Sequence, residues 1–274
     1  MKVFLRLLDF YINSSIHVAL AVCSLLLLTY IEFKIPLSKS LLFFVFFGTI
    51  SGYNFIKYAK VAGLHHSSLT NSLKSIQVFS VMAGVLMFYF AFQLSISSLA
   101  TIGILGILTV LYAVPFLYRK SLRNVQGLKI FIVAFVWAGL TGIVPFIEAR
   151  ETIIIDVLII FLQRFIVVLV LIFPFEIRDL PYDALILKTV AQKLGVINVK
   201  RIGYFLLAVL IGLEFLKEMV HISFLLSLLI ISLSIAFVLF KSKTTQSKYF
   251  TIFWVEGLPI LWLGLVLLLD DFLM

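Results

Sequence analysis

Charged residues are scarce in this chain and make up only 13% of its 274 residues. A water-soluble domain carries about a quarter, whereas here 63% of the residues are hydrophobic and the mean hydropathy is +1.19. This composition excludes an ordinary soluble domain and indicates an integral membrane protein. Cysteine is nearly absent as well. Because Cys23 is the single one in the sequence, an intramolecular disulfide is excluded.

Acidic residues are missing from one long stretch, since no Asp or Glu occurs between Glu32 and Glu148. The whole chain has 22 Lys and Arg against 13 Asp and Glu, a net charge of +9 and a pI of about 9.6. In a soluble protein this excess would indicate nucleic acid as the partner. In a membrane protein it is explained by basic cytoplasmic loops, so we expect membrane lipids as partners and no nucleic acid.

Apolar segments of about 17–23 residues, the length that crosses a bilayer core, occur nine times. They predict an all-α, multi-pass bundle of about nine transmembrane helices, with residues 1–274 forming one membrane domain. We place the spans at residues 10–31, 39–56, 75–93, 99–117, 125–147, 153–175, 202–218, 222–240 and 249–269.

The Lys and Arg residues orient these spans. With the N-terminus inside, the inner segments hold seventeen of the 22, and the outer loops hold only Lys34, Lys39, Arg150 and Lys217. This bias predicts a cytoplasmic N-terminus and an outer C-terminus. The first residues show no cleavable signal or transit-peptide pattern, which favours a prokaryotic plasma membrane.

Three acids stand at the end of the sixth predicted span. Glu176, Asp179 and Asp183 are three and then four residues apart, so on a helix they would share one face. Carboxylates beside a hydrocarbon layer are costly unless they are paired, solvated or hold a cation. Mg²⁺ suits such ligands and takes one or two carboxylates together with substrate phosphates. A magnesium site for a phosphate-bearing substrate is one interpretation, and a solvated loop face is the other.

These acids also resemble a known motif. Glu176-x-x-Asp179-x-x-x-Asp183, followed by Thr189 and Leu194-Gly195, is similar to the second aspartate-rich motif of the UbiA superfamily of intramembrane prenyltransferases. The resemblance covers nearly the full chain, but only this motif is specific. Weaker similarities lie in Tyr112-x-x-Pro115 with Arg119-Lys120, and in Gly52-Tyr53-Asn54.

The resemblance implies a function. Members of the superfamily bind the diphosphate of an isoprenyl donor through Mg²⁺, ionise it to an allylic cation and attach that cation to an aromatic or other hydrophobic acceptor. It implies Glu176, Asp179 and Asp183 as Mg²⁺ ligands, with Asp179 and Asp183 catalytic, and Tyr58 near the reacting carbon. Diphosphate contacts would come from Asn54, Lys57 and the basic cluster Arg119, Lys120 and Arg123, although contact with anionic lipid headgroups explains that cluster equally well.

The first aspartate motif of the superfamily is degenerate here. Counting from Asn54, the two positions that should be Asp are Tyr58 and Ala62. Either one Mg²⁺ binds and Lys57 or Lys60 supplies the missing positive charge, or the protein is a non-catalytic relative that binds isoprenoid or lipid. A transporter is a distant third interpretation, because no repeated pair of broken spans is visible.

Two further expectations concern local structure. Thr189-x-x-Gln192 resembles a capping box, so a helix should begin at Val190 and run toward Gly195, as part of a lid over the cavity mouth. Arg164 and Glu256 are ionisable residues within spans, which indicates either a functional charge or a structural ion pair between the two.

Overall fold

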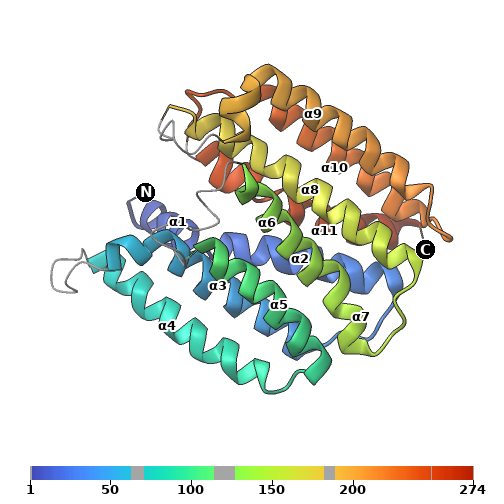
Figure 1. Ribbon diagram of the computed structural model, residues 1–274, viewed down its shortest axis with the longest axis horizontal. Helices are drawn as coiled ribbons and strands as arrows, with labels where there is room; N and C mark the ends of the chain where they lie inside the picture. The colour runs from blue at the N-terminus through green and yellow to red at the C-terminus, as the bar shows by residue number, and fades with distance from the viewer. Residues whose placement is uncertain (1, 63–70, 114–126, 182–188, 248, 274) are drawn as a thin grey trace.

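The computed structural model describes residues 2–62, 71–113, 127–181, 189–247 and 249–273. These residues form helices joined by short turns, and no strand occurs among them. Figure 1 shows the helices side by side as a bundle. The helices are α1 (Lys2–Asn13), α2 (Ile16–Phe33), α3 (Lys39–Ala62), α4 (Asn71–Ala91), α5 (Ile96–Ala113), α6 (Leu128–Ala138), the π-helix η3 (Gly139–Ile143), α7 (Val144–Ala149), α8 (Ile155–Asp179), α9 (Val190–Glu214), α10 (Ile222–Lys241), the π-helix η5 (Phe250–Val255) and α11 (Leu258–Leu273).

The predicted membrane spans are confirmed as apolar helices. In the described part of the chain, eight segments are long and apolar enough to cross a bilayer, and a shorter apolar helix covers Ile96–Leu111. Each of them overlaps one of the nine predicted spans. In lipid a helix satisfies all of its own backbone hydrogen bonds, which is why continuous apolar runs predict these elements well. The protein is a multi-pass membrane helix bundle.

The first span was predicted too early. Residues 10–13 belong to the separate helix α1, and α2 begins only at Ile16. Ser15 between them has a left-handed backbone with φ of 62°, which ends the first helix. Tyr249 donates a 2.7 Å hydrogen bond to Asp9, so α1 is tied to the residues before η5. That carboxylate raises the pKa of Tyr249, so the hydroxyl keeps the proton it donates.

The seventh span also differs from its prediction. Helix α9 runs from Val190 to Glu214 instead of covering residues 202–218, and Thr189 and Gln192 form the predicted capping box. Gly195 interrupts this helix with φ of 77° and ψ of 157°, a backbone conformation that residues other than glycine rarely adopt. The segment therefore starts as a short helical turn and continues, after a kink, as the seventh membrane helix.

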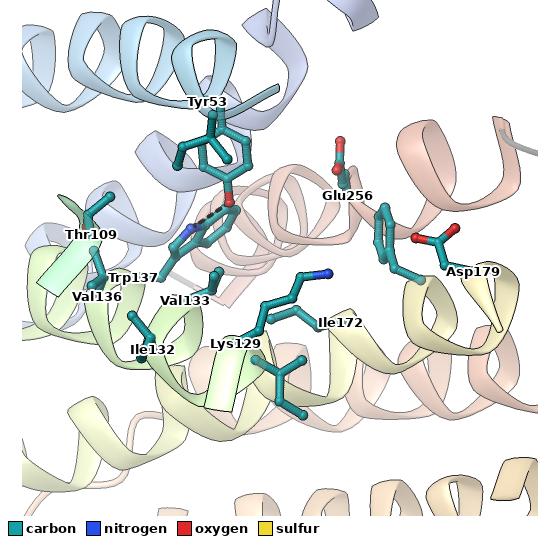
Figure 2. A pocket seen from close by; sticks show the side chains of 13 residues that line it. Tyr53, Thr109, Lys129, Ile132, Val133, Val136, Trp137, Ile172, Asp179 and Glu256 are labelled. Atoms are coloured by element: carbon teal, nitrogen blue, oxygen red, sulfur yellow. Dashed lines mark hydrogen bonds between the residues drawn. The ribbon is translucent and has the colours of Figure 1, made fainter. Parts of the chain in front are cut away.

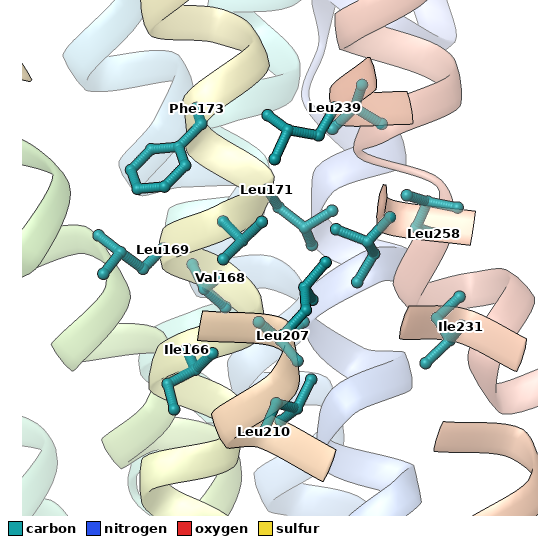
Figure 3. Close-up of a cluster of buried hydrophobic side chains, with 14 of the residues drawn as sticks. Ile166, Val168, Leu169, Leu171, Phe173, Leu207, Leu210, Ile231, Leu239 and Leu258 are labelled. Atoms are coloured by element: carbon teal, nitrogen blue, oxygen red, sulfur yellow. The ribbon is translucent and has the colours of Figure 1, made fainter. Parts of the chain in front are cut away.

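Helix α8 is the most buried of the candidate spans. It packs against α6 on one side and α9 on the other. Its apolar residues form the main core with residues of α9, α10 and α11, as Figure 3 shows for Leu171, Leu207 and Leu239. A second core joins α2 to α3 and η3. Helix α11 contacts both α2 and α10 and so lies between the two cores.

The contact of α9 with α10 depends on Gly203. A methyl group added there would clash with Leu239 Cδ2 and lie 3.4 Å from the ring of Phe173. We expect Gly203→Val to lower the free energy of unfolding by about 1–3 kcal/mol through overpacking, measured as thermal unfolding of the purified protein in detergent. Gly212→Val on the same helix is the matched control, because a Cβ at Gly212 meets nothing within 4 Å. Equal melting temperatures for the two variants would contradict this account of the packing.

Candidate active site

A cavity of about 250 Å³ opens between α3, α5, α6 and α8, and Glu256 at the start of the last span also lines it. Most of its lining is apolar (Figure 2), including Val133, Ile172 and Phe175. A smaller cavity of about 60 Å³ adjoins it and shares part of the same lining. The polar side chains of the larger cavity are Tyr53, Thr109, Lys129, Trp137, Asp179 and Glu256.

Two of the three predicted metal ligands lie at the end of α8, and one of them, Asp179, lines this cavity. Glu176 and Asp179 occupy the last turn of α8, three residues apart. The Glu176 side chain is 3% exposed, and its Oε1 lies 3.8 Å from Lys129 Nζ. Asp179 is about one-third exposed and lines the cavity. Asp183 lies outside the described residues and stays a prediction.

Arg178 fixes the Asp179 carboxylate. Its Nε and Nη2 donate to the two oxygens of Asp179 at 2.7 and 3.2 Å, and its Nη1 donates to Thr251 Oγ1 at 2.5 Å. The guanidinium therefore joins the end of α8 to η5. Sequence reasoning counted Arg178 only as an inner charge, although its position directly before the motif aspartate could have singled it out.

Lys129 was also missed. It stands near the start of α6, and the sequence shows no motif around it. Figure 2 shows its side chain reaching along the cavity toward the end that holds Asp179 and Glu256. Its proximity to Glu176 depends on the packing of α6 against α8, which no local pattern in the sequence reveals.

Asn54, predicted to contact the diphosphate, is buried and held on both sides of its amide. Its Oδ1 accepts from Ser15 Oγ at 2.8 Å, and its Nδ2 donates to the carbonyl of Ser14 at 2.9 Å. These bonds connect α3 to the turn between α1 and α2. Asn54 is not part of the cavity lining.

Lys57 and Tyr58 contact the same turn. The Tyr58 hydroxyl donates to the carbonyl of Asn13 at 3.0 Å, and Lys57 Nζ donates to that carbonyl at 3.4 Å. Neither residue lines the cavity, but Lys57 is within electrostatic reach of Glu256. The predicted substrate roles of both stay predictions, as do those of Arg119, Lys120 and Arg123, which lie outside the described residues.

The expected ion pair between Arg164 and Glu256 is wrong. Arg164 is 2% exposed, stacks over the Trp262 ring at 4.3 Å and is in the field of Glu32 and Glu214. Glu256 instead shares a cavity with Asp179. Arg164 precedes Asp179 by fifteen residues on α8, which is roughly 22 Å along a helix. The two charges therefore lie toward opposite ends of the bundle.

The charges at the cavity end alternate in sign. Lys129 and Arg178 carry positive charge beside the carboxylates of Glu176 and Asp179, and apolar walls adjoin them. Such a site suits an amphiphile with an anionic head and an apolar body. Within the described residues no three His, Cys, Asp or Glu side chains are grouped closely enough to hold a metal ion.

The fold and this site define a multi-pass membrane bundle with a charged, apolar-walled cavity. No family model matches the sequence, and no curated protein matches it by sequence. Solved structures do match. An apo UbiA homologue from Aeropyrum pernix K1 aligns with a TM-score of 0.64 at 12% identity, covering 93% of this chain and 98% of that one. A UbiA homologue from Archaeoglobus fulgidus bound to GPP and Mg²⁺ aligns with a TM-score of 0.61 at 13% identity, covering 96% and 99%.

A third match is a digeranylgeranylglyceryl phosphate synthase, with a TM-score of 0.57 at 16% identity over 98% of this chain and 97% of that one. The chain therefore has the UbiA fold over nearly its whole length. The resemblance that the second aspartate motif predicted is confirmed at the level of the fold.

Proposed function

We propose that the protein is a Mg²⁺-dependent prenyltransferase that moves an isoprenyl group from an isoprenyl diphosphate to a hydrophobic acceptor in the membrane. The observation that carries this proposal is the cavity of the UbiA fold, with apolar walls leading to Asp179 and Lys129. One protein of the same fold was solved with GPP and Mg²⁺. An isoprenyl diphosphate has the matching shape, since it joins a long apolar chain to a strongly anionic head.

The residues present fit a magnesium ion. Glu176 and Asp179 supply hard carboxylate oxygens one helical turn apart, and Mg²⁺ takes one or two carboxylates plus phosphate oxygens. Asp183 is proposed as a further ligand. When bound, the ion would neutralise charge on the departing diphosphate.

The chain's own cations have the complementary task. Lys129 lines the cavity and can meet a phosphate oxygen as a point charge. Arg178 holds the Asp179 carboxylate in one orientation. Lys57 or Lys60 is proposed to supply the positive charge that a second metal would have given, and Arg119, Lys120 and Arg123 are proposed as further contacts of the diphosphate. The walls formed by Trp137, Ile172 and Phe175 would keep water from an allylic cation.

A second candidate function is binding of isoprenoid or lipid without catalysis. It is favoured by the first-motif segment of α3, where Tyr58 takes the place of the first aspartate and its hydroxyl is bonded to Asn13. Asn54 is likewise held by Ser14 and Ser15. In this case donor would bind in a metal-dependent way and no diphosphate would be released.

The cellular setting is part of the proposal. The charge bias supports a cytoplasmic N-terminus and one membrane domain over residues 1–274. The charged end of the cavity lies at the end of α8 that this orientation faces inward, where soluble isoprenyl diphosphates are accessible. A prokaryotic plasma membrane is the proposed location.

Release of inorganic diphosphate tests both functions. The purified full chain is incubated with allylic donors of ten to twenty carbons and mixed aromatic and lipid acceptors, with Mg²⁺ or with EDTA. We expect EDTA to lower the rate of diphosphate release by at least ~10²-fold, because a metal stabilises leaving-group charge by several kcal/mol. Mg²⁺-dependent donor binding without release would instead establish the non-catalytic function. A protein that neither binds the donor nor releases diphosphate would contradict both functions.

A further inference from the structure

Glu256 reaches the cavity through an irregular turn. It directly follows the π-helix η5, and its backbone N–H donates to the carbonyl of Thr251, five residues earlier, at 3.2 Å. Such turns are rare and occur frequently at functional sites. One extra residue in a turn rotates the later residues by about 100° around the helix axis. Figure 2 shows the resulting carboxylate at the same end of the cavity as Lys129 and Asp179.

The backbone around Glu256 is held from helix α2. The Phe253 carbonyl accepts from Gly257 N at 3.0 Å and from His17 Nε2 at 2.9 Å. Tyr11 donates to His17 Nδ1 at 2.7 Å, which leaves the proton on Nε2, and burial raises the pKa of Tyr11 so that it stays a donor. A Cβ at Gly257 would lie 2.7 Å from the Phe253 carbonyl oxygen. The contact between α2 and η5 therefore fixes the position of Glu256.

Among the described residues, Glu256 differs from the other polar groups of the cavity because its side chain makes no hydrogen bond or ion pair with the protein. Tyr53 and Trp137 bond to each other, Thr109 bonds to Leu105, Lys129 pairs with Glu176, and Asp179 pairs with Arg178. Within the described part of the chain, the Glu256 side chain makes no hydrogen bond or ion pair. A carboxylate facing an apolar cavity is costly unless something donates to it, so its donor would come from a bound molecule.

The location of Glu256 indicates which molecule that is. It lines both the 250 Å³ and the 60 Å³ cavities, so it stands where the two volumes join. Lys57 and Arg178 lie in its electrostatic field, and carboxylate oxygens accept hydrogen bonds from O–H groups. An anionic diphosphate would avoid it. A neutral partner with an O–H group would bind it.

We propose that Glu256 binds the hydroxyl of the acceptor and takes its proton during transfer. This inference rests on the proposed prenyltransferase function and narrows the acceptor to an alcohol or phenol that reacts at oxygen. The bond between C1 of the isoprenyl group and the diphosphate oxygen breaks, and its electron pair leaves with the diphosphate. The acceptor oxygen forms the new bond to C1, and its proton passes to the Glu256 carboxylate.

The test uses the purified full chain with Mg²⁺ and geranyl diphosphate. The acceptor probes are 1-O-hexadecylglycerol and 1-naphthol, each beside its fully O-methylated ether, which has no free hydroxyl. We expect Glu256→Gln to lower the ratio of ether product to free geraniol by at least ~10²-fold, the usual contribution of a general base. The KM for the acceptor should rise, and Glu256→Asp should recover part of the ratio because it keeps the carboxylate. Glu151→Gln, at an exposed residue, is the matched control and should keep the wild-type ratio.

The outcomes separate the two proposals. Absence of diphosphate release in the wild type overturns the proposed function and this inference with it. Release with a wild-type product ratio in Glu256→Gln overturns the inference alone. Three other results would also overturn the inference alone. They are equal transfer to the methyl ethers, transfer to carbon with the hydroxyl left intact, and diphosphate release without transfer to either hydroxyl probe.

Discussion

Replacing Asp179 with asparagine is expected to lower the rate of diphosphate release by about 10²- to 10³-fold while the protein still folds. Asparagine has the same size and keeps one oxygen for Arg178, but it loses the negative charge that would hold a divalent cation. Metal stabilisation of leaving-group charge amounts to several kcal/mol, and each 1.36 kcal/mol is a tenfold change in rate. The measurement is the initial rate of release over a Mg²⁺ titration.

Two controls make this result specific. Asp271→Asn changes the same group at an exposed position near the end of α11, and we expect less than a ~2-fold effect. Asp179 is one-third exposed and its ion pair with Arg178 is partly solvated, so losing that pair costs at most about 1 kcal/mol of stability. An Asp179→Asn protein with wild-type rate and wild-type Mg²⁺ dependence would remove the second aspartate motif from the chemistry.

The distribution of charge explains how one aspartate motif could suffice. The segment between Glu32 and Glu148 has no acid, so α3 has Tyr58 and Ala62 at the two first-motif positions and Lys57 directly before Tyr58. Lys129 of α6 lies beside Glu176. A diphosphate at this end would meet ammonium groups on one side and a carboxylate-bound cation on the other. Both neutralise the same developing charge.

The sequence predicted the features that depend on neighbouring residues. The apolar runs predicted the spans because each membrane helix satisfies its own backbone. The capping box at Thr189 was predicted because both of its hydrogen bonds lie within four residues. The spacing of Glu176 and Asp179 placed them one turn apart on α8, as found.

Features that depend on distant packing were missed. The break at Ser15 is stabilised by Asn54, 39 residues later in the chain, so the first span was begun too early. The partners of Arg164 come from α2 and α9, so its depth within a span could not identify them. Glu256 faces the cavity because a π-turn changes the helical register, and regular periodicity does not anticipate that turn.

Replacing Lys217 with methionine is expected to destabilise the protein by about 3–5 kcal/mol. Lys217 Nζ lies 2.5 Å from Glu32 Oε1 and 2.7 Å from Glu214 Oε2, and all three side chains are at most 8% exposed. Gln163 donates a further hydrogen bond to Glu214. Removing the ammonium would leave two buried carboxylates with only Arg164 nearby, and breaking a buried ion pair in this way has a cost of that size. The measurement is thermal unfolding in detergent, with a fall of roughly 10 °C.

The effect of Lys217→Met on stability can be distinguished from an effect on the active site. Lys39→Met removes a lysine at an exposed position and should change stability by less than about 0.5 kcal/mol. Adding Glu32→Gln to Lys217→Met should recover part of the lost stability, because it removes one of the two carboxylates that Lys217→Met leaves without an ammonium partner. Strict additivity of the two changes would show that the charges are solvated and independent. Since the cluster lies at the end of the bundle away from Asp179, Lys217→Met should lower the melting temperature and leave the product ratio of the folded protein as it was.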